Sequence, residues 1–247
     1  MTKFSFEVPI KHLTDFHDLQ DFHFCLSMLF SYNRYVDYHR EIRDSGLKTI
    51  WIDNSFNEKF VADDLHDLLY WYREMDAVRL VAPDSIEWET SQIEKSYRDA
   101  CSHIGNAKTI LVCRNYQMYL DLKHLNPGTV AVSYWKRPGM EMAEWTYEQL
   151  KKITHRLHFL GLNSIEELLI VNPQSCDTSM PIKLALVGKT LKQWMEEGCP
   201  HINTKDLGHQ GKSFFEAEMS NYQIDLARRN ICDLKGLLTD TTACVKY

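Results

Sequence analysis

Short apolar runs of β-type residues alternate with amphipathic stretches along most of this 247-residue chain. Such alternation is typical of a parallel sheet whose strands are joined by crossover helices. The predicted strands are Phe22–Phe30, Lys48–Asp53, Ala77–Asp84, Lys108–Arg114, Gly128–Trp135, His158–Leu162 and Ser175–Asp177. The predicted helices include Ala62–Met75, Thr90–Ile104, Tyr116–His124, Thr146–Leu157, one that starts at Ser164, one that Pro181 opens, and Glu216–Leu238.

Seven βα-like units in sequence predict an α/β fold, a (β/α)8 TIM-like barrel that is irregular at the eighth unit and ends in a C-terminal helix. We expect one catalytic domain spanning residues 1–247. A doubly wound open sheet is the rival architecture, and it is less favoured because no Gly-rich phosphate loop follows an early strand. The polar, irregular residues 198–213 are expected to form a loop over the barrel mouth.

Composition bounds the class of protein. A hydrophobic fraction of 44% and a charged fraction of 25% are typical of a globular protein. No apolar stretch has the length of a membrane span, and the N-terminus lacks a signal-peptide core. Seven cysteines are dispersed without a Cys-x-x-Cys pair, which favours reduced thiols in the cytoplasm and no zinc site. The net charge of −6 leaves room only for local basic strips, such as Lys136-Arg137.

Three aspartates stand at or just after the ends of predicted strands. They are Asp53, Asp84 and Asp177. Carboxyl ends of parallel strands open on one mouth of a barrel, so we expect the three side chains to converge there. Each has a structural alternative, because Asp-Asn-Ser and Pro-Asp favour turns and Asp177 can cap a helix. Several carboxylates in one mouth suit chemistry at a glycosidic carbon, where one attacks and another moves a proton.

Two short motifs resemble the tRNA-guanine transglycosylase superfamily, and within it the short phage and bacterial members that act on DNA. The segment His158–Leu169 followed by Cys176-Asp177 resembles the Gly-x-Gly-x-Pro-Glu-Asp-Leu-Leu and Phe-Asp-Cys motifs of that family. Residues 52–56, Ile-Asp-Asn-Ser-Phe, resemble its Asp-Ser-Gly-Gly-Phe motif. The resemblance covers roughly residues 48–190.

The resemblance implies roles for particular residues. Asp177 corresponds to the nucleophile, Asp53 to a base that also helps to hold the substrate, and Asp84 to an aspartate that reads the heterocycle. The further residues that we expect to bind substrate are Asn54, Ser55, Phe56, Gly161, Asn115 and Tyr134, with Trp135 as another candidate for stacking on a flipped base. Lys136 and Arg137 are expected to contact the nucleic-acid backbone.

The same resemblance implies the partners. We expect base exchange in DNA rather than tRNA, with guanine leaving and a free 7-deazaguanine base entering, in the cytoplasm of a bacterium or a phage-infected cell. No cofactor, metal ion or membrane is expected. Aromatic residues on the C-terminal helix are compatible with a homodimer.

The chain also departs from the family pattern. Asn54-Ser55 replaces the glycine pair, the Cys-rich zinc motif of the tRNA enzymes is missing, and Cys113–Gln117 lacks the expected Gln-Gly pair. Three alternatives stay open at this point. Water in place of a second base would make the protein a DNA glycosylase. If the barrel only binds nucleic acid, Asp177→Ala should change none of its measurable properties. A metal-dependent hydrolase would use Asp63, His66 and Asp67, although no His-x-His follows the first strand.

Overall fold

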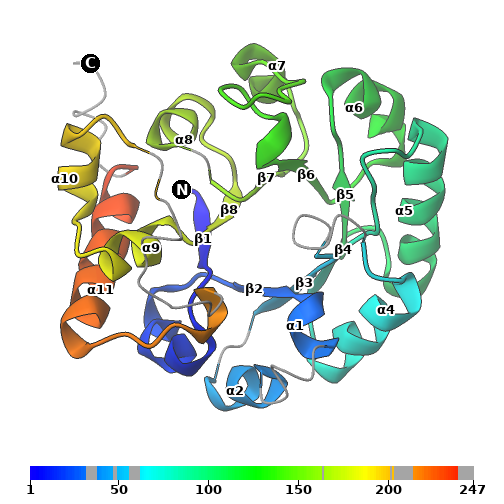
Figure 1. The fold of residues 1–247 in the computed structure, drawn as a ribbon. Coiled ribbons are helices and arrows are strands. Elements are labelled where there is room, and N and C mark those ends of the chain that lie inside the picture. The colour runs from blue at the N-terminus through cyan, green and yellow to red at the C-terminus, as the bar shows by residue number, and fades with distance from the viewer. Residues whose placement is uncertain are drawn as a thin grey trace.

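The computed structural model describes residues 1–31, 38–46, 49–55, 62–162, 164–200, 202 and 214–238. Their strands form one parallel eight-stranded sheet in the order β1-β8-β7-β6-β5-β4-β3-β2. The strands are β1 (Lys3–Phe6), β2 (His23–Leu26), β3 (Ile50–Asp53), β4 (Arg79–Val81), β5 (Thr109–Val112), β6 (Thr129–Ser133), β7 (Leu157–Leu160) and β8 (Ser175–Thr178). Figure 1 shows them as a ring, which confirms the predicted α/β barrel and excludes the doubly wound open sheet.

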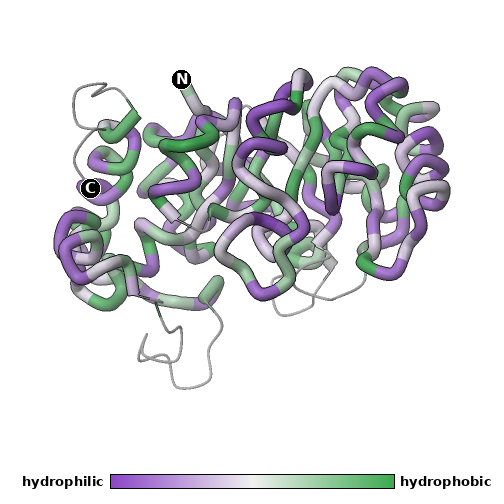
Figure 2. Tube along the Cα trace, turned by 90° about the horizontal axis from the view of Figure 1, so that it is seen from above, coloured by the Kyte–Doolittle hydropathy of each residue, from purple (hydrophilic) through white to green (hydrophobic). Residues whose placement is uncertain are grey.

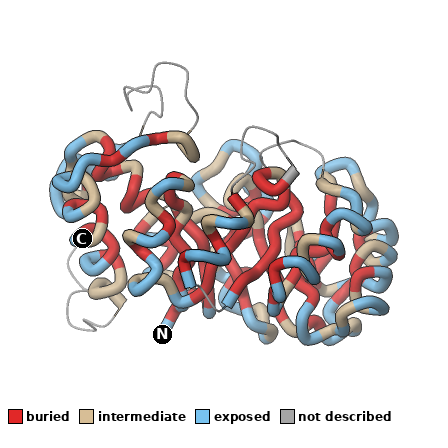
Figure 3. Tube along the Cα trace, turned by 90° about the horizontal axis from the view of Figure 1, so that it is seen from below, coloured by how far each residue is buried: buried red, intermediate tan, exposed pale blue. Residues whose placement is uncertain are grey.

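The helices lie outside the ring of strands (Figure 1). They are α1 (Ser27–Ser31), α2 (Tyr38–Asp44), α4 (Leu65–Glu74), α5 (Thr90–Ile104), α6 (Tyr116–Leu122), α7 (Tyr147–Lys151), α8 (Ile165–Val171), α9 (Met180–Leu186), α10 (Leu191–Glu196) and α11 (Asn221–Gly236). Hydrophilic and hydrophobic stretches alternate along them (Figure 2), as one-sided burial requires. Figure 3 shows the result, buried strands inside a shell of helices with exposed outer sides.

The core has two parts because successive side chains of a strand point to opposite faces. The larger part fills the space between the sheet and the helices. The smaller part fills the barrel interior and consists of Phe22, Phe24, Trp51, Val81, Ile110, Val112, Ala131 and Leu160. Phe22 stacks on Trp51 with ring centroids 4.1 Å apart, and the guanidinium of Arg79 lies 4.6 Å from the centroid of the same indole. The interior is therefore packed below the mouth, as in other barrels of this size.

The eighth strand lies at the N-terminus, not after the seventh predicted unit. The short alternating run of β1 does not stand out in the sequence, but it pairs in parallel with β8 and aligns Ser5 with Asp177. Side chains bridge its other edge, where β2 is adjacent. The Phe4 N–H donates to Asp21 Oδ2 at 2.8 Å, and the Phe24 N–H donates to Ser5 Oγ at 2.9 Å. This edge is the seam of the barrel.

Several predicted boundaries are wrong by a few residues. The predicted strand Phe22–Phe30 ends at Leu26, where its pairing with β3 ends, and its second half is helix α1. The predicted helix Thr146–Leu157 ends at Lys151, and Leu157 instead opens β7. The C-terminal helix starts at Asn221 rather than Glu216, because Ser220 and Gln223 form a capping box there.

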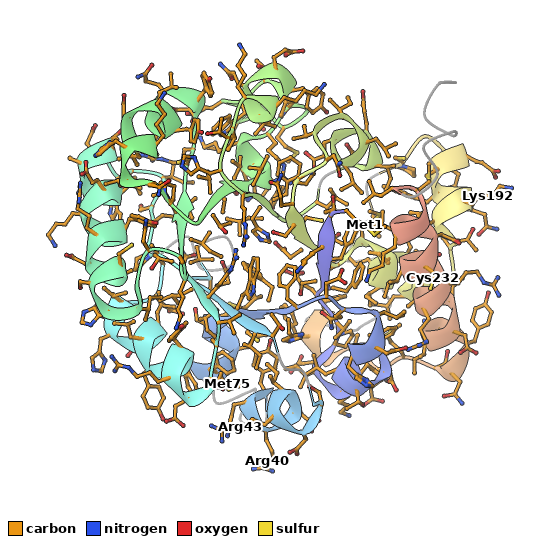
Figure 4. The ribbon with its side chains drawn as sticks, turned by 180° about the vertical axis from the view of Figure 1, so that it is seen from behind. Met1, Arg40, Arg43, Met75, Lys192 and Cys232 are labelled. Atoms are coloured by element: carbon orange, nitrogen blue, oxygen red, sulfur yellow. The ribbon has the colours of Figure 1, made fainter. Side chains whose placement is uncertain are left out.

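Helices α9, α10 and α11 pack together beside β1 and β8 (Figure 1). Helix α10 is absent from the sequence prediction. Lys192 on α10 and Cys232 on α11 lie at the rim of the molecule (Figure 4). The predicted loop 198–213 is described only at residues 198–200 and 202, so most of it lies outside the described residues.

Candidate active site

A cavity of about 790 Å³ lies at the C-terminal ends of the strands. The last residues of β2, β3, β7 and β8 all line it, which places it at the mouth where barrels of this kind carry their sites. Five of the residues predicted from the sequence meet in this mouth cavity: Asp53, Tyr134, Trp135, Gly161 and Asp177. They come from β3, from β8 and from the turns after β6 and β7.

Asp177 is a buried, hydrogen-bonded carboxylate of the mouth cavity. It is 4% exposed, and both of its oxygens accept from the Gly161 N–H at 3.1 Å. Its own carbonyl accepts from the Leu162 N–H at 3.0 Å, so the turn after β7 is tied to β8 twice. Gly161 has a φ of 68°, and an added Cβ would lie 3.3 Å from the Tyr134 ring. A glycine is therefore required where the backbone approaches the carboxylate.

Asp53 is the last residue of β3, and the chain turns directly after it. Its Oδ2 accepts from the Ser55 N–H at 2.9 Å, which is the local turn that an Asp-Asn-Ser sequence favours. Ser55 has a φ of 55°, in the left-handed region that glycine adopts most readily. Its hydroxyl lies 3.1 Å from Ser27 Oγ and accepts from the Met28 N–H at 3.0 Å. Ser55 therefore shapes the turn that presents Asp53 and does not itself line the mouth cavity.

Asp84 and Asn54 form a buried pair outside the mouth cavity. Asn54 Nδ2 donates to Asp84 Oδ1 at 2.6 Å and to the Ala82 carbonyl at 2.8 Å. Asp84 lies three residues beyond the end of β4 and lines a second cavity, of about 870 Å³, with Asp63, Asp64 and Trp88. Burial raises the pKa of Asp84 to about 6, although Asn54 and Arg114 act in the opposite direction. The structure thus brings together two of the three predicted aspartates in one cavity.

Lys136 and Arg137 lie inside the protein, which corrects the expectation that they contact phosphates. Arg137 is fully buried and pairs with Glu167, with Nε 2.9 Å from Oε2. Its remaining guanidinium hydrogens go to the carbonyls of Val132, Leu160 and Gly161. Lys136 is 6% exposed and pairs with Glu144. Arg137 therefore fixes the turns around Gly161, and neither cation is available at the surface.

Asn115 and Phe56 complete the predicted set. Asn115 caps α6, where its Oδ1 accepts from the Met118 N–H at 2.8 Å, and its amide nitrogen donates to Glu144. It does not line the mouth cavity. Phe56 lies outside the described residues.

The sequence prediction missed other residues of the mouth cavity. Glu7 and Glu166 add acidic groups, Tyr147 adds an aromatic ring, and Lys183 is the basic residue of the described lining. Tyr134 and Trp135 pack on each other with ring centroids 4.3 Å apart. Lys183 Nζ lies 5.5 Å from the centroid of the Phe214 ring. The cavity therefore combines carboxylates, aromatic faces and one cation.

His158 is a further residue that the sequence prediction did not assign. It lies in β7, directly below the mouth, with Nε2 3.2 Å from Asp177 Oδ1. The two atoms are close but are not aligned as a regular hydrogen bond. A histidine inside an otherwise apolar strand was the signal available in the sequence.

No group of three or more His, Cys, Asp or Glu side chains is placed to hold a metal ion within the described ranges. This includes Asp63, His66 and Asp67, of which Asp63 instead accepts from Ser27 Oγ at 2.5 Å. None of the helices that the structure describes has the length and apolar character of a membrane span.

Comparisons with known proteins give similarity in structure only. No protein-family model and no curated protein sequence matches the chain. It is similar to a thiamine phosphate pyrophosphorylase from Pyrococcus furiosus, at 7% identity and a TM-score of 0.48 over 94% of this chain and 96% of that one. A 3-hexulose-6-phosphate synthase has 9% sequence identity and a TM-score of 0.49, over 71% of this chain and 89% of that one. A FabK mutant from Thermotoga maritima has 7% sequence identity and a TM-score of 0.49, over 96% of this chain and 94% of that one.

These values are too low to carry an argument about function. The fold and the site define the protein as an α/β barrel with a pair of buried aspartates in its mouth. The transglycosylase resemblance remains a prediction that rests on the short motifs around Asp53 and Asp177.

Proposed function

We propose that the protein is a nucleic-acid base transglycosylase, which exchanges guanine for a 7-deazaguanine derivative in DNA through a covalent aspartyl-glycosyl intermediate. The observation that supports this most is that Asp53 and Asp177 line the same mouth cavity. One carboxylate to attack and another to move a proton are the minimum that a double displacement at a glycosidic carbon needs.

In the first step a nucleotide is flipped out of the stack, because its glycosidic carbon is unreachable within a duplex. An oxygen of Asp177 attacks the C1′ carbon, the bond from C1′ to the base nitrogen breaks, and a glycosyl ester forms. Asp53 in its acid form gives its proton to the departing base. The Gly161 N–H, shared between both oxygens, holds the attacking carboxylate in place before the reaction.

In the second step the incoming 7-deazaguanine occupies the vacated place. Its ring nitrogen attacks C1′, the ester bond breaks, and Asp177 returns to the carboxylate. The N–H proton of the incoming base goes to Asp53, which restores the starting state. Two displacements on the same carbon retain its configuration.

The remaining lining of the mouth cavity suits a nucleotide. Tyr134 presents an aromatic ring beside Gly161, where a flipped base can stack. Lys183 takes the phosphate-contacting role that the sequence assigned to Lys136 and Arg137. Its side chain has no carboxylate within ion-pair distance among the described residues, whereas Lys192 on α10 pairs with Glu196 at 3.9 Å.

The test is to incubate the protein with single-stranded DNA, double-stranded DNA and tRNA, each with and without 7-deazaguanine bases. Released bases and the nucleosides of the digested polymer are then identified by mass spectrometry. We expect guanine release that depends on the added base, incorporation of that base into DNA, and loss of both with Asp177→Ala. Asp225→Ala, which changes an exposed aspartate of α11, is the matched control.

Each outcome separates the candidates. Base release that leaves an abasic site without any added base would identify a DNA glycosylase instead. Base exchange in tRNA alone would show that the substrate is tRNA and not DNA. Identical results for wild type and Asp177→Ala would contradict any glycosidic chemistry at this site and favour a binding protein.

A further inference from the structure

His158 occupies an unusual place for a polar side chain, the packed interior of the barrel. It is fully buried, and its ring centroid lies 6.0 Å from that of Phe22, 5.1 Å from that of Phe24 and 5.4 Å from that of Trp51. An imidazole surrounded by aromatic rings loses its hydration, so its nitrogens need partners within the protein. The partners available to it are both on β8.

Ser175 and Asp177 present these partners on the same face of β8, two residues apart. The Ser175 hydroxyl lies 2.9 Å from Nδ1 of His158. Asp177 Oδ1 lies 3.2 Å from Nε2, and that ring nitrogen has no aligned hydrogen-bond partner among the described residues. If the Ser175 O–H donates to Nδ1, the ring proton is placed on Nε2, where it faces the carboxylate.

The charges around His158 favour a ring with a single proton. Burial is the largest effect and lowers the pKa of His158, and Arg137 and Arg79 lower it further, whereas Asp177 raises it. These are the charged groups that face the ring from β4, β8 and the turn after β6. The lowered pKa is therefore compatible with a neutral His158 ring that carries its one proton on Nε2 at neutral pH.

We propose that His158 is a positioning residue for the nucleophile, which donates its Nε2–H to Asp177 Oδ1 and leaves Oδ2 to attack the substrate. Oδ1 lies against both His158 and Gly161, whereas Oδ2 accepts from Gly161 alone within the described part of the chain. Hydrogen bonds of this kind are often poorly aligned before substrate binds and tighten in the reacting complex. This role rests on the proposed function, but the contact itself can be tested without it.

The contact is tested by NMR of the histidine ring nitrogens in the full-length protein, with the His158 signal assigned from its loss in His158→Gln. We expect a neutral ring with its proton on Nε2 at neutral pH. We also expect Asp177→Asn to shift the Nε2 signal and Ser175→Ala to allow the proton onto Nδ1. An Nδ1–H ring, or an Nε2 signal that is indifferent to Asp177→Asn, would overturn the proposal whether or not base exchange is found.

The catalytic effect is tested by the kinetics of base exchange. His158→Leu removes the donor and should lower kcat by about 100-fold without a matching change in KM, as expected for a misplaced reacting group. His158→Gln keeps an N–H near the Nε2 position and should retain most of the wild-type kcat.

His23→Leu is the matched control, because His23 is a buried histidine of β2 between the inward-facing Phe22 and Phe24. It should leave kcat unchanged. Equal kcat losses in His158→Leu and His158→Gln, or a wild-type kcat in His158→Leu, would contradict the role. Absence of exchange in every form, with the Nε2–H contact to Asp177 intact in the NMR test, would reject the proposed function and not the contact.

Discussion

At the scale of single residues, Asp84 is a carboxyl group with a neutral amide as its nearest partner. Asn54 Nδ2 donates to it at 2.6 Å, and burial raises its pKa from 3.8 to about 6. The folded protein therefore binds this proton more tightly than the unfolded chain does. The resulting stabilisation is complete below about pH 4 and is lost as the pH rises through about 6.

Asp84→Asn should therefore stabilise the protein at pH 8. The variant keeps an oxygen that accepts from Asn54 and carries no charge. A pKa difference of about two units corresponds to roughly 3 kcal/mol, which is the upper limit of the expected gain in unfolding free energy. Urea unfolding of both forms at pH 4 and pH 8 measures this. A variant whose stability relative to wild type is the same at both values would contradict the account of Asp84.

Sequence and structure agree best on the position of residues at the ends of strands. Asp53 and Asp177 were predictable because the carboxyl ends of parallel strands share one mouth. Arg137 was not, because its partner Glu167 lies 30 residues further along the chain and is brought to it only by folding. The sequence of a basic pair does not indicate whether the two side chains will be exposed or buried in ion pairs with acidic residues. His158 was missed for a similar reason, since Ser175 and Asp177 become its neighbours through the pairing of β7 and β8.

At the scale of elements, Asn230 of α11 joins three helices. It is fully buried, accepts from the Leu191 N–H of α10 at 2.8 Å, and donates to the Pro181 carbonyl of α9 at 3.2 Å. A third hydrogen bond reaches the Lys189 carbonyl at 3.1 Å. The Leu191 N–H lies in the first turn of α10, where it has no partner within its own helix. Asn230 thus fixes the helices next to the strand that carries Asp177.

Asn230→Ala should lower the unfolding free energy by about 2–4 kcal/mol, because it leaves buried backbone groups without partners. Asn221→Ala, at the exposed first residue of the same helix, is the control and should change it by less than about 0.5 kcal/mol. Denaturant unfolding of the two variants gives the comparison. Equal effects would show that the hydrogen bonds of Asn230 do not hold α11 in place.

Elements were predictable where the apolar pattern is long, as in α5, whose bounds match the prediction. They were not predictable where a short segment depends on distant residues. The strand β1 has four residues, and its edges are satisfied by β8 on one side and by side chains of Gln20 and Asp21 on the other. Helix α10 has six residues and is held through Asn230. Local propensity is too weak to specify such pieces.

At the scale of the whole molecule, the seam between β1 and β2 closes the barrel without a ladder of backbone hydrogen bonds. Asp21 bridges it by accepting from the Phe4 N–H, and it also lies 3.2 Å from Lys235 Nζ of α11. The seam adjoins β8, which pairs with β1 on its other edge. Opening it would therefore disturb the strand that presents Asp177.

Asp21→Ala should lower the unfolding free energy by about 1–3 kcal/mol, since the Phe4 N–H loses its acceptor. Asp21→Asn keeps an acceptor oxygen and should cost less. Hydrogen exchange at the Phe4 amide is the direct readout, and it should become faster in Asp21→Ala than in Asp21→Asn. Unchanged exchange in both variants would mean that the Asp21 carboxylate does not hold the seam closed.

The central claim is that Asp177 forms a covalent bond to a glycosidic carbon at the mouth of the barrel. The most direct measurement is to incubate the protein with labelled DNA in the absence of a second base, denature the mixture, and look for DNA that stays attached to the protein. The account predicts an attached species with wild type that disappears on adding a 7-deazaguanine base and never forms with Asp177→Ala. An attached species that persists in Asp177→Ala, or its absence while DNA bases are still exchanged, would contradict it.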